Sequence, residues 1–235
     1  MGDPAFDPEP ITRADSEGWL ARIREEMGVT FDTLALRRST LPEEARGDIE
    51  AALALRASLS ARLAEPSGRN IQGLKTRYHG DYHLGQVLLQ NNDFAITDFE
   101  GEPSRPVSVR RQKHTPLRDV ASMLRSFNYV MYTALDHVGM GREEQTAVLL
   151  PHARAWERAV CEAFLTSYAS HTRGTGLWEN FSRVQEWLHL FVLEKALYEL
   201  RYEMDNRPQA VSIPLRGLVQ YADPESIEVG SRGVD

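Results

Sequence analysis

Residues 78–103, YHGDYHLGQVLLQNNDFAITDFEGEP, interrupt the helical spacing of apolar residues that runs through most of this chain. Within this segment, two short apolar runs flank Asn91, Asn92 and Asp93, residue types that tolerate the left-handed backbone of a tight turn. The pattern predicts a β-hairpin. We therefore expect a mainly α fold with one small β-hairpin that carries the polar motifs.

Helical spacing of apolar residues predicts helices on both sides of this segment. The predicted ranges are 16–27 and 42–64 before it, and 114–135, 142–170, 177–203 and a short final helix within 206–222 after it. In the range 114–135, Thr115 can cap the helix and Pro116 fits its first turn. One face of that helix then carries Val120, Leu124, Phe127 and Met131.

The chain divides into three predicted parts. Residues 1–14 form a proline-containing extended lead-in, residues 15–222 form the body, and residues 223–235 form a flexible tail. The stretch EPSGRN at 65–70 predicts a break in the chain before the polar motifs of 78–103.

The composition limits the classes of partner and compartment. The formal net charge of -7 leaves no overall basic surface, so neither nucleic acid nor a membrane is an expected partner. Arg110, Arg111 and Lys113 nevertheless form a local basic cluster that suits an anion. Cys161 is the single cysteine, and the first residues lack the pattern of a signal peptide. These features favour a cytoplasmic protein.

The polar segment gathers acidic, amide and imidazole side chains, namely His79, Asp81, His83, Gln86, Asp98 and Glu100. Two histidines four residues apart, with a third acidic ligand, could bind zinc, but Gly80 and the strand pattern after it oppose the helix that such a pair needs. A polar loop whose side chains cap neighbouring backbone groups explains each residue singly but not the whole set. The third interpretation is phosphoryl transfer.

Phosphoryl transfer needs a carboxylate that orients and deprotonates the acceptor hydroxyl, and oxygen ligands that hold Mg²⁺ against the phosphates. In kinase-like catalytic loops the base aspartate is followed five positions later by an amide ligand, then by a hairpin and a metal-binding aspartate. Asp81, Gln86 and Asp98 have this order and spacing. The sequence therefore favours phosphoryl transfer over the other two interpretations.

Several motifs make the resemblance more specific: HGDYHLGQVL, DFEGEP, PLRDVASMLRSF, YELRYEMDNRP and IPLRGL, spread between residues 75 and 218. In these motifs the chain resembles the bacterial maltokinases, which are aminoglycoside-phosphotransferase-like kinases, and especially the maltokinase region fused to trehalose synthase. The resemblance implies the C-terminal lobe of a protein-kinase-like fold. It also implies conversion of ATP and maltose to ADP and maltose 1-phosphate, in trehalose and glycogen metabolism.

The resemblance also implies roles for individual residues. Asp81 is the implied catalytic base, Gln86 and Asp98 are the implied Mg²⁺ ligands, and ATP is the implied phosphoryl donor. His79 is expected to brace the loop, and Glu100 to lie near the metal and the phosphates. The candidate sugar contacts, for which a packed helix end is the alternative role, are His83, Arg118, Tyr198, Tyr202, Glu203, Asn206 and Arg207. Arg118 and Asp119 could instead pair with neighbours at the start of their helix.

A kinase of this kind also needs a nucleotide-binding lobe with a Gly-rich loop and a strand lysine. No Gly-rich loop precedes Tyr78, and Lys75 is the first lysine of the chain. We therefore expect a fragment, an excised domain or a truncated gene product with little activity alone. Two alternatives stay open. One is a lobe that phosphorylates glucosamine or another sugar. The other is a non-catalytic sugar-binding or docking module for trehalose synthase or the missing N-terminal lobe, with an exposed apolar patch.

Overall fold

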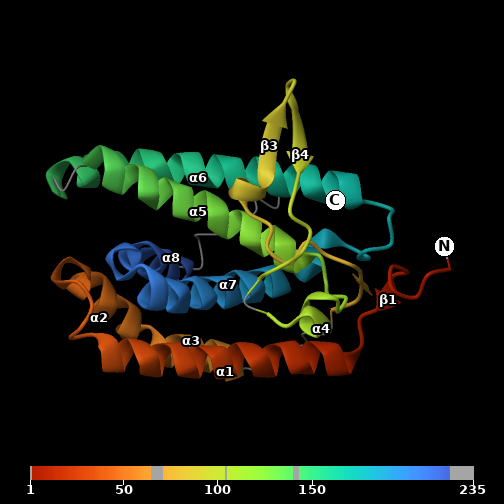
Figure 1. The fold of residues 1–235 in the computed structure, drawn as a ribbon, viewed down its shortest axis with the longest axis horizontal. Helices are drawn as coiled ribbons and strands as arrows, with labels where there is room; N and C mark the ends of the chain where they lie inside the picture. Colours follow the sequence, from red (N-terminus) through yellow and green to blue (C-terminus); the bar gives the residue numbers. More distant parts are fainter. Residues whose placement is uncertain (1, 65–70, 104, 140–142, 223–235) are drawn as a thin grey trace.

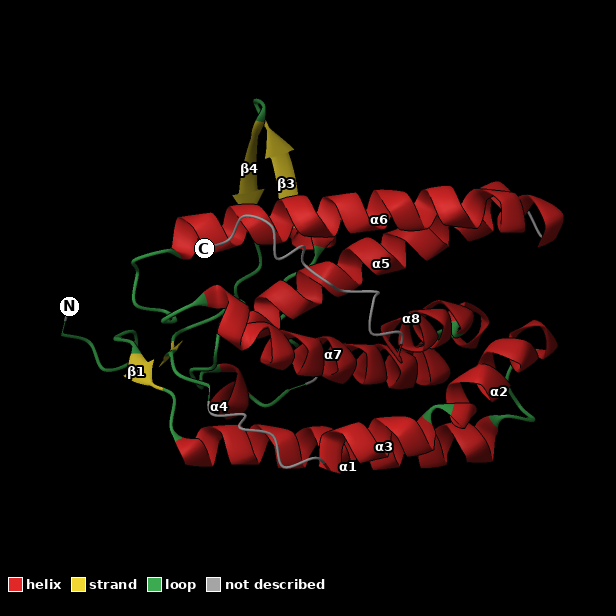
Figure 2. Ribbon diagram, turned by 180° about the vertical axis from the view of Figure 1, so that it is seen from behind, coloured by secondary structure: helices red, strands yellow, loops and turns green. Residues whose placement is uncertain are grey.

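Long helices lie side by side through most of the chain, and two small sheets accompany them (Figures 1 and 2). The structure is a computed structural model that describes residues 2–64, 71–103, 105–139 and 143–222. The helices are α1 (Arg13–Arg37), α2 (Arg46–Ala54), α3 (Arg56–Ala64), α4 (Val107–Arg110), α5 (Leu117–Gly139), α6 (Glu143–Thr172), α7 (Gln185–Asn206) and α8 (Ser212–Ala222). The strands are β1 (Glu9–Pro10), β2 (Leu74–Lys75), β3 (Val87–Gln90) and β4 (Asp93–Ile96).

Helix α1 begins at a capping box. The Thr12 hydroxyl accepts a hydrogen bond from Asp15 N at 3.2 Å, and the Asp15 carboxylate accepts one from Thr12 N at 2.8 Å. The helix continues to Arg37, beyond the predicted range, because Phe31 and Leu34 extend its buried face. Because α1 begins at Arg13, the lead-in is shorter than the predicted residues 1–14. Strand β1 within it pairs antiparallel with β2.

The predicted single helix over 42–64 is wrong, because the chain turns at Leu55 between α2 and α3. Both helices contact α1, and α2 packs mainly on α8. The turn allows Ile49 of α2 and both Leu59 and Leu63 of α3 to be buried at once. Tertiary packing therefore overrides the continuous helical spacing of the sequence.

Helix α5 lies between α6 and α7 and forms the centre of the bundle (Figure 1). Its predicted cap is present, since the Thr115 hydroxyl accepts a hydrogen bond from Leu117 N at 3.4 Å. The buried face of α5 includes Val120 and Leu124, as the spacing predicts. Helix α7 begins later than predicted, at Gln185, because a 3₁₀ turn occupies the residues before it. Arg118 at the start of α5 contacts Glu194 in the middle of α7, so these two parts of the bundle lie close to each other.

The hairpin lies where the sequence predicts it and projects away from the helices (Figures 1 and 2). Strands β3 and β4 pair antiparallel, and Asn91 and Asn92 form the turn with φ values of 52° and 62°. Leu88, Leu89 and Phe94 are exposed on it, at 54%, 71% and 72%. An exposed apolar surface of this kind is what a docking module requires, so that alternative stays open.

Two sequence predictions fall on residues that are not described. The flexible tail at 223–235 and the whole break at 65–70 lie outside the described residues. In the part of the chain that the structure does describe, no helix combines the length and the hydropathy that a bilayer crossing requires.

Candidate active site

His79 joins the two polar motifs of the sequence. Its ring is buried, Nδ1 accepts a hydrogen bond from Asp81 N at 3.3 Å, and Nε2 lies 2.8 Å from the Thr97 carbonyl oxygen. An accepting Nδ1 leaves the ring hydrogen on Nε2, which then donates to Thr97. One imidazole therefore holds the Asp81 loop against the residue that precedes Asp98.

These contacts also bear on the zinc interpretation. Both ring nitrogens of His79 are engaged, and Nδ1 of His83 accepts a hydrogen bond from Gly85 N at 3.0 Å. Among the residues that the structure describes, no group of three or more His, Cys, Asp or Glu side chains is arranged to hold a metal ion. The ring nitrogens in these contacts therefore form hydrogen bonds with backbone groups.

Gly80 and Gly101 allow the two motifs to pack backbone against backbone. Their φ values are 85° and 76°, in the left-handed region that favours glycine. A Cβ on Gly80 would lie 3.3 Å from the Gly101 Cα, and a Cβ on Gly101 would lie 3.5 Å from the His79 carbonyl oxygen. The glycines of the HGD and DFEG motifs therefore permit the close contact between the Asp81 loop and the Asp98 loop.

Asp119 of α5 clamps the same loop. Its carboxylate accepts hydrogen bonds from His79 N at 2.7 Å and from Gly80 N at 2.9 Å. Burial raises the pKa of the Asp119 carboxyl above its ordinary value, although these two hydrogen bonds favour the charged form. Asp119 lies in the first turn of α5, where the helix dipole also stabilises a negative charge. The start of α5 therefore fixes the conformation of residues 79 and 80.

Asp81 lies between a lysine and a histidine. Lys195 of α7 places Nζ 3.3 Å from Asp81 Oδ1, and His83 Nε2 lies 3.7 Å from Oδ2. The Asp81 side chain is 18% exposed, so the carboxylate is partly accessible. Lys195 Nζ also lies 4.9 Å from the centroid of the Tyr198 ring. Asp81 is therefore an oriented, accessible carboxylate.

Gln86 and Asp98 meet at the base of the hairpin. Gln86 Nε2 donates to Asp98 Oδ2 at 2.9 Å, and Thr97 N donates to the Gln86 carbonyl at 2.9 Å. Rotation of the Gln86 amide would present its Oε1 in place of Nε2. An amide oxygen and a carboxylate are ligands that Mg²⁺ takes together with water and phosphate oxygens. The residues present therefore fit a Mg²⁺ site of the predicted kind.

A pocket opens beside the Asp81 loop, between the start of α5 and the middle of α7. It is lined by residues from both motifs and both helices, including Tyr78, Gly80, Glu102, Arg118, Asp119, Glu194, Lys195 and Tyr198. Two of the predicted sugar contacts, Arg118 and Tyr198, therefore lie in one pocket next to the partner of Asp81. Their role in sugar binding stays a prediction.

Arg118 is held in the wall of this pocket. Its Nη2 donates to Glu194 Oε1 across the gap between α5 and α7. Burial disfavours the charge on the guanidinium, but the Glu194 carboxylate outweighs it and raises the pKa of Arg118 above its ordinary value. Arg118 thus pairs with a neighbouring helix, while Asp119 pairs with the Asp81 loop.

The other candidate residues lie outside the pocket. Glu100 points to solvent with 83% of its side chain exposed, and its nearest cation is Arg110 at 4.0 Å. His83 is 39% exposed. Tyr202 is 44% exposed and stacks on Tyr198, with ring centroids 6.4 Å apart.

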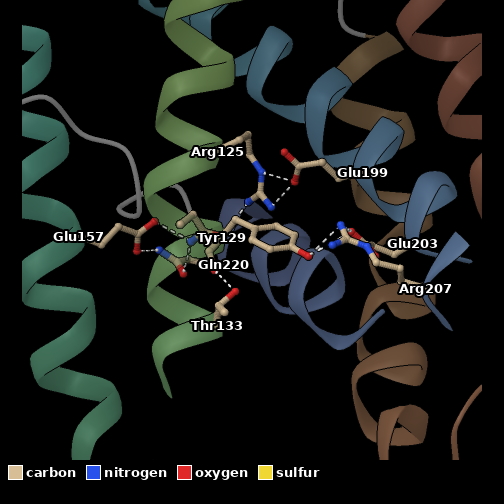
Figure 3. Close-up of polar contacts among 9 residues, drawn as sticks. Arg125, Tyr129, Thr133, Glu157, Glu199, Glu203, Arg207 and Gln220 are labelled. Carbon is tan, nitrogen blue, oxygen red and sulfur yellow. Dashed lines mark hydrogen bonds and ion pairs between the residues drawn. The ribbon is translucent and has the colours of Figure 1, made fainter. Parts of the chain in front are cut away.

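Glu203 and Arg207 lie next to the hydroxyl group of Tyr129 of α5 (Figure 3). The Tyr129 hydroxyl donates to Glu203 at 3.0 Å, and Arg207 donates to the same carboxylate at 2.6 Å. Burial, with Glu203 adding to it, raises the pKa of Tyr129 to about 12, so the hydroxyl keeps its hydrogen. Asn206 donates to the Tyr202 carbonyl at the end of α7. The structure gives these residues packing and capping contacts.

His114 lies behind the pocket, stacked on Trp19 with ring centroids 4.3 Å apart. Burial, and then the charge of Arg118, hold the pKa of His114 well below its ordinary 6.5. Because the unfolded chain takes up this proton and the folded chain does not, the free energy of unfolding is expected to fall as the pH drops below about 6.5, by up to about 1.4 kcal/mol per pH unit.

Chemical denaturation between pH 6.5 and pH 5 checks this expectation. The variant His114→Phe keeps a ring against Trp19 and should show a smaller loss of stability over this range. The variant His137→Gln, which changes an exposed histidine of α5, should keep the loss. Equal pH dependence in His114→Phe and the unmodified chain would show that His114 is not the group responsible.

Sequence reasoning missed Lys195 and Glu194 and gave Asp119 only a role in its own helix. The signal for the first two is a charged pair that directly follows the apolar run WLHLFVL at 187–193. Charged side chains in such a position are seldom buried unless they are paired. Their partners, Asp81 and Arg118, lie on other elements and become visible in the fold.

Comparison with known proteins finds no matching family model. The chain is 32% identical over 161 residues to a glucosamine kinase of Streptacidiphilus jiangxiensis, which covers 68% of this chain and 32% of that protein. It is 25% identical over 209 residues to a glucosamine kinase of Mycolicibacterium smegmatis, which covers 87% of this chain and 46% of that protein. The chain therefore spans less than half the length of each relative.

Solved structures of glucosamine kinase share the fold. One, in complex with glucosamine, ADP and inorganic phosphate, matches with a TM-score of 0.64 at 24% identity over 90% of this chain and 48% of that chain. A second crystal form matches with a TM-score of 0.66 over the same shares. The described helices and hairpin thus follow the architecture of about half of that kinase.

The expected resemblance to the maltokinases is therefore wrong, and so is the maltose phosphotransfer that it implies. These relatives and structural neighbours are named glucosamine kinase, which agrees with the alternative acceptor considered from the sequence. None of them supports trehalose synthase as a partner.

Proposed function

We propose that this chain carries the acceptor-binding and metal-binding part of a sugar kinase that transfers the terminal phosphoryl group of ATP to glucosamine. The observation that carries the proposal is the packing of the Asp81 loop against the Asp98 loop through His79, Gly80 and Gly101. The packing joins a base beside a pocket to a pair of oxygen ligands. The names of two relatives and of a structural neighbour support the acceptor, and the ADP and phosphate of that neighbour support ATP.

In the proposed reaction a hydroxyl group of the sugar donates a hydrogen bond to Asp81. The hydroxyl oxygen attacks the terminal phosphorus of ATP, a P–O bond to the sugar forms as the P–O bond to ADP breaks, and Asp81 takes the hydroxyl proton. Lys195 keeps the carboxylate oriented through its contact with Oδ1. Mg²⁺ bound by Gln86 and Asp98 would offset the negative charge of the phosphates.

The acidic side chains of the pocket support an amino sugar. Among the described residues, four acidic side chains line it, Glu26, Glu102, Asp119 and Glu194, against three cationic ones, Arg105, Arg118 and Lys195. Glu194 pairs with Arg118 and Glu26 pairs with Arg201, and carboxylates form short, strong hydrogen bonds with an ammonium group. Glucosamine carries such a group, whereas maltose has only hydroxyl and ether oxygens. The excess of one acidic side chain favours an ammonium group only slightly, so the names of the relatives and of the structural neighbour carry the choice of glucosamine.

The proposal also places this chain within a larger enzyme. We infer that residues 15–222 form the C-terminal lobe of a kinase-like fold, and that the rest of the ATP site belongs to the part of the kinases that this chain does not match. The coverage of 46% of one relative and 48% of one solved structure supports this inference. Full activity is accordingly expected of the natural polypeptide that contains these residues together with that part.

Replacing Asp98 by Asn is expected to raise the Mg²⁺ concentration needed for half-maximal activity by at least about tenfold, because the amide loses the negative charge that holds the ion. Asparagine tolerates the φ of 64° at this position, so the loop keeps its shape. The measurement is a Mg²⁺ titration of the kinase rate. The matched control Asp93→Asn, in the exposed hairpin turn, should leave the titration unchanged. An unchanged titration in Asp98→Asn would exclude Asp98 as a ligand.

Calorimetric titration with sugars tests the proposed acceptor without needing turnover. Glucosamine is expected to bind the chain, and maltose is expected not to bind. The variant Glu194→Gln, which removes a pocket carboxylate, should weaken glucosamine binding. Binding of maltose in preference to glucosamine would overturn the proposed acceptor.

A further inference from the structure

A second hollow lies between the lead-in and the turn after α4. Four cationic and two acidic side chains line it: Lys75, Arg77, Arg111, Lys113, Glu9 and Asp15. The hollow therefore has an excess of two positive charges in a chain whose net charge is -7. A local reversal of charge of this kind favours a negatively charged ligand.

The two carboxylates neutralise the two lysines. Asp15 lies 2.8 Å from Lys75 Nζ, and Glu9 lies 2.5 Å from Lys113 Nζ. Within the described residues, neither Arg77 nor Arg111 has a carboxylate within salt-bridge distance. The uncompensated charge of the hollow therefore belongs to the two arginines.

The Arg77 side chain is held against the backbone of Arg111. Arg77 Nη1 donates to the Arg111 carbonyl at 2.5 Å, which ties one arginine to the backbone of the other. The Arg77 guanidinium also lies 5.9 Å from the centroid of the Phe6 ring. A guanidinium that is fixed in this way loses little freedom on binding, and its fork of N–H groups matches the oxygens of a phosphate.

Residues of the lead-in line one side of the hollow and are held there by hydrogen bonds. Lys113 Nζ donates to the Pro4 carbonyl at 2.6 Å as well as to Glu9, and β1 pairs with β2 beside it. These contacts hold Phe6 against Arg77. The hollow is therefore formed by segments that are far apart in the sequence and are joined by hydrogen bonds and strand pairing.

From these contacts we propose that the hollow is a binding site for a small anion of the phosphate class, with Arg77 and Arg111 as its ligands. The site is separate from the proposed catalytic pocket, although one extended segment borders both. Lys75 and Arg77 line the hollow, whereas Tyr78 lines the pocket, and Thr76 between them pairs with His114 through two backbone hydrogen bonds of 2.9 and 3.0 Å. Neighbouring side chains of an extended segment point in opposite directions, which accounts for this division.

Calorimetric titration with inorganic phosphate, without Mg²⁺ and at an ionic strength matched with chloride, tests the site. The chain is expected to bind phosphate, and Arg111→Gln is expected to weaken the binding about tenfold or more, because a charge-assisted, bidentate contact is lost. The matched control Arg38→Gln, at an exposed arginine near the end of α1, should bind as the unmodified chain does. Absence of phosphate binding, or equal binding by Arg111→Gln, would overturn the proposal.

Two further arms separate the ligand sources and the two sites. Titrations with a sugar phosphate and with ADP show whether a phosphate on a larger molecule is preferred, and binding of either that Arg111→Gln weakens supports the site. The variant Asp98→Asn should bind phosphate normally if the site is the hollow. Without Mg²⁺ the Asp98 carboxylate repels an anion, so tighter binding in Asp98→Asn together with full binding in Arg111→Gln would assign the anion to the catalytic site and overturn the proposal, without counting against the proposed kinase function.

Discussion

Replacing Asp81 by Asn is expected to lower the rate of glucosamine phosphorylation by a factor of about 10² to 10⁴, the range that general-base catalysis contributes. The amide cannot take the proton of the acceptor hydroxyl. It has nearly the same size as the carboxylate, so the contact of Asp81 N with His79 should persist. The measurement is kcat with ATP, Mg²⁺ and glucosamine, and the KM for glucosamine should change much less than kcat.

Two controls make this result specific. Asp205→Asn changes an aspartate of α7 that pairs with Arg37 on the surface, and it should keep the full rate. A denaturation curve of Asp81→Asn must show a folded protein, because Lys195 loses its charged partner in this variant. A folded Asp81→Asn with more than about a tenth of the original rate would exclude Asp81 as the base.

Replacing Asp119 by Ala is expected to lower the free energy of unfolding by about 2–4 kcal/mol, since it leaves two enclosed N–H groups without an acceptor and each costs about 1–3 kcal/mol. These groups belong to His79 and Gly80, so the catalytic rate should fall as well. Asp119→Asn retains one acceptor oxygen and should lose less stability. Chemical denaturation measures both variants.

The matched control for Asp119 is Asp136→Ala, in the same helix. Asp136 pairs with Arg216 at the surface, with 45% of its side chain exposed, and Arg216 keeps Asp48 as a second partner. Its replacement should therefore cost no more than about 1 kcal/mol. Equal losses in Asp119→Ala and Asp136→Ala would contradict the clamp that we assign to Asp119.

Local signals in the sequence predicted the elements that depend on local chemistry. Asn91 and Asn92 specify the turn of the hairpin because both adopt left-handed backbone angles, and Thr115 caps α5 through its own hydroxyl. The break at Leu55 depends on which helices α2 and α3 pack against. Such a contact between distant segments has no local signal, and the helical spacing of the sequence continues through it.

The candidate site follows the same division. The spacing of Asp81, Gln86 and Asp98 is local and predicts the Gln86–Asp98 contact that the structure contains. Lys195 reaches Asp81 from a helix 114 residues away, and no spacing rule could place it there. The resemblance to the maltokinases rests on short local motifs, and the comparisons, which extend over most of the chain, name a different sugar kinase.

The hairpin carries exposed apolar side chains of the kind that a further part of a longer kinase could cover. Leu89 and Phe94 are exposed on the hairpin whose base carries the Gln86–Asp98 pair. The relatives have more than half of their length outside the region that this chain matches. An exposed apolar surface near the proposed Mg²⁺ ligands is what we expect where the remaining part of a kinase covers it.

The most direct test of the proposed function is ATP-dependent phosphorylation by the natural polypeptide that contains these 235 residues, with the product identified by mass spectrometry. Glucosamine and maltose are supplied in parallel, with and without Mg²⁺. We expect phosphorylated glucosamine that requires both Mg²⁺ and Asp81, and no phosphorylated maltose. Phosphorylated maltose without phosphorylated glucosamine, or no phosphorylated sugar at all, would contradict the proposal.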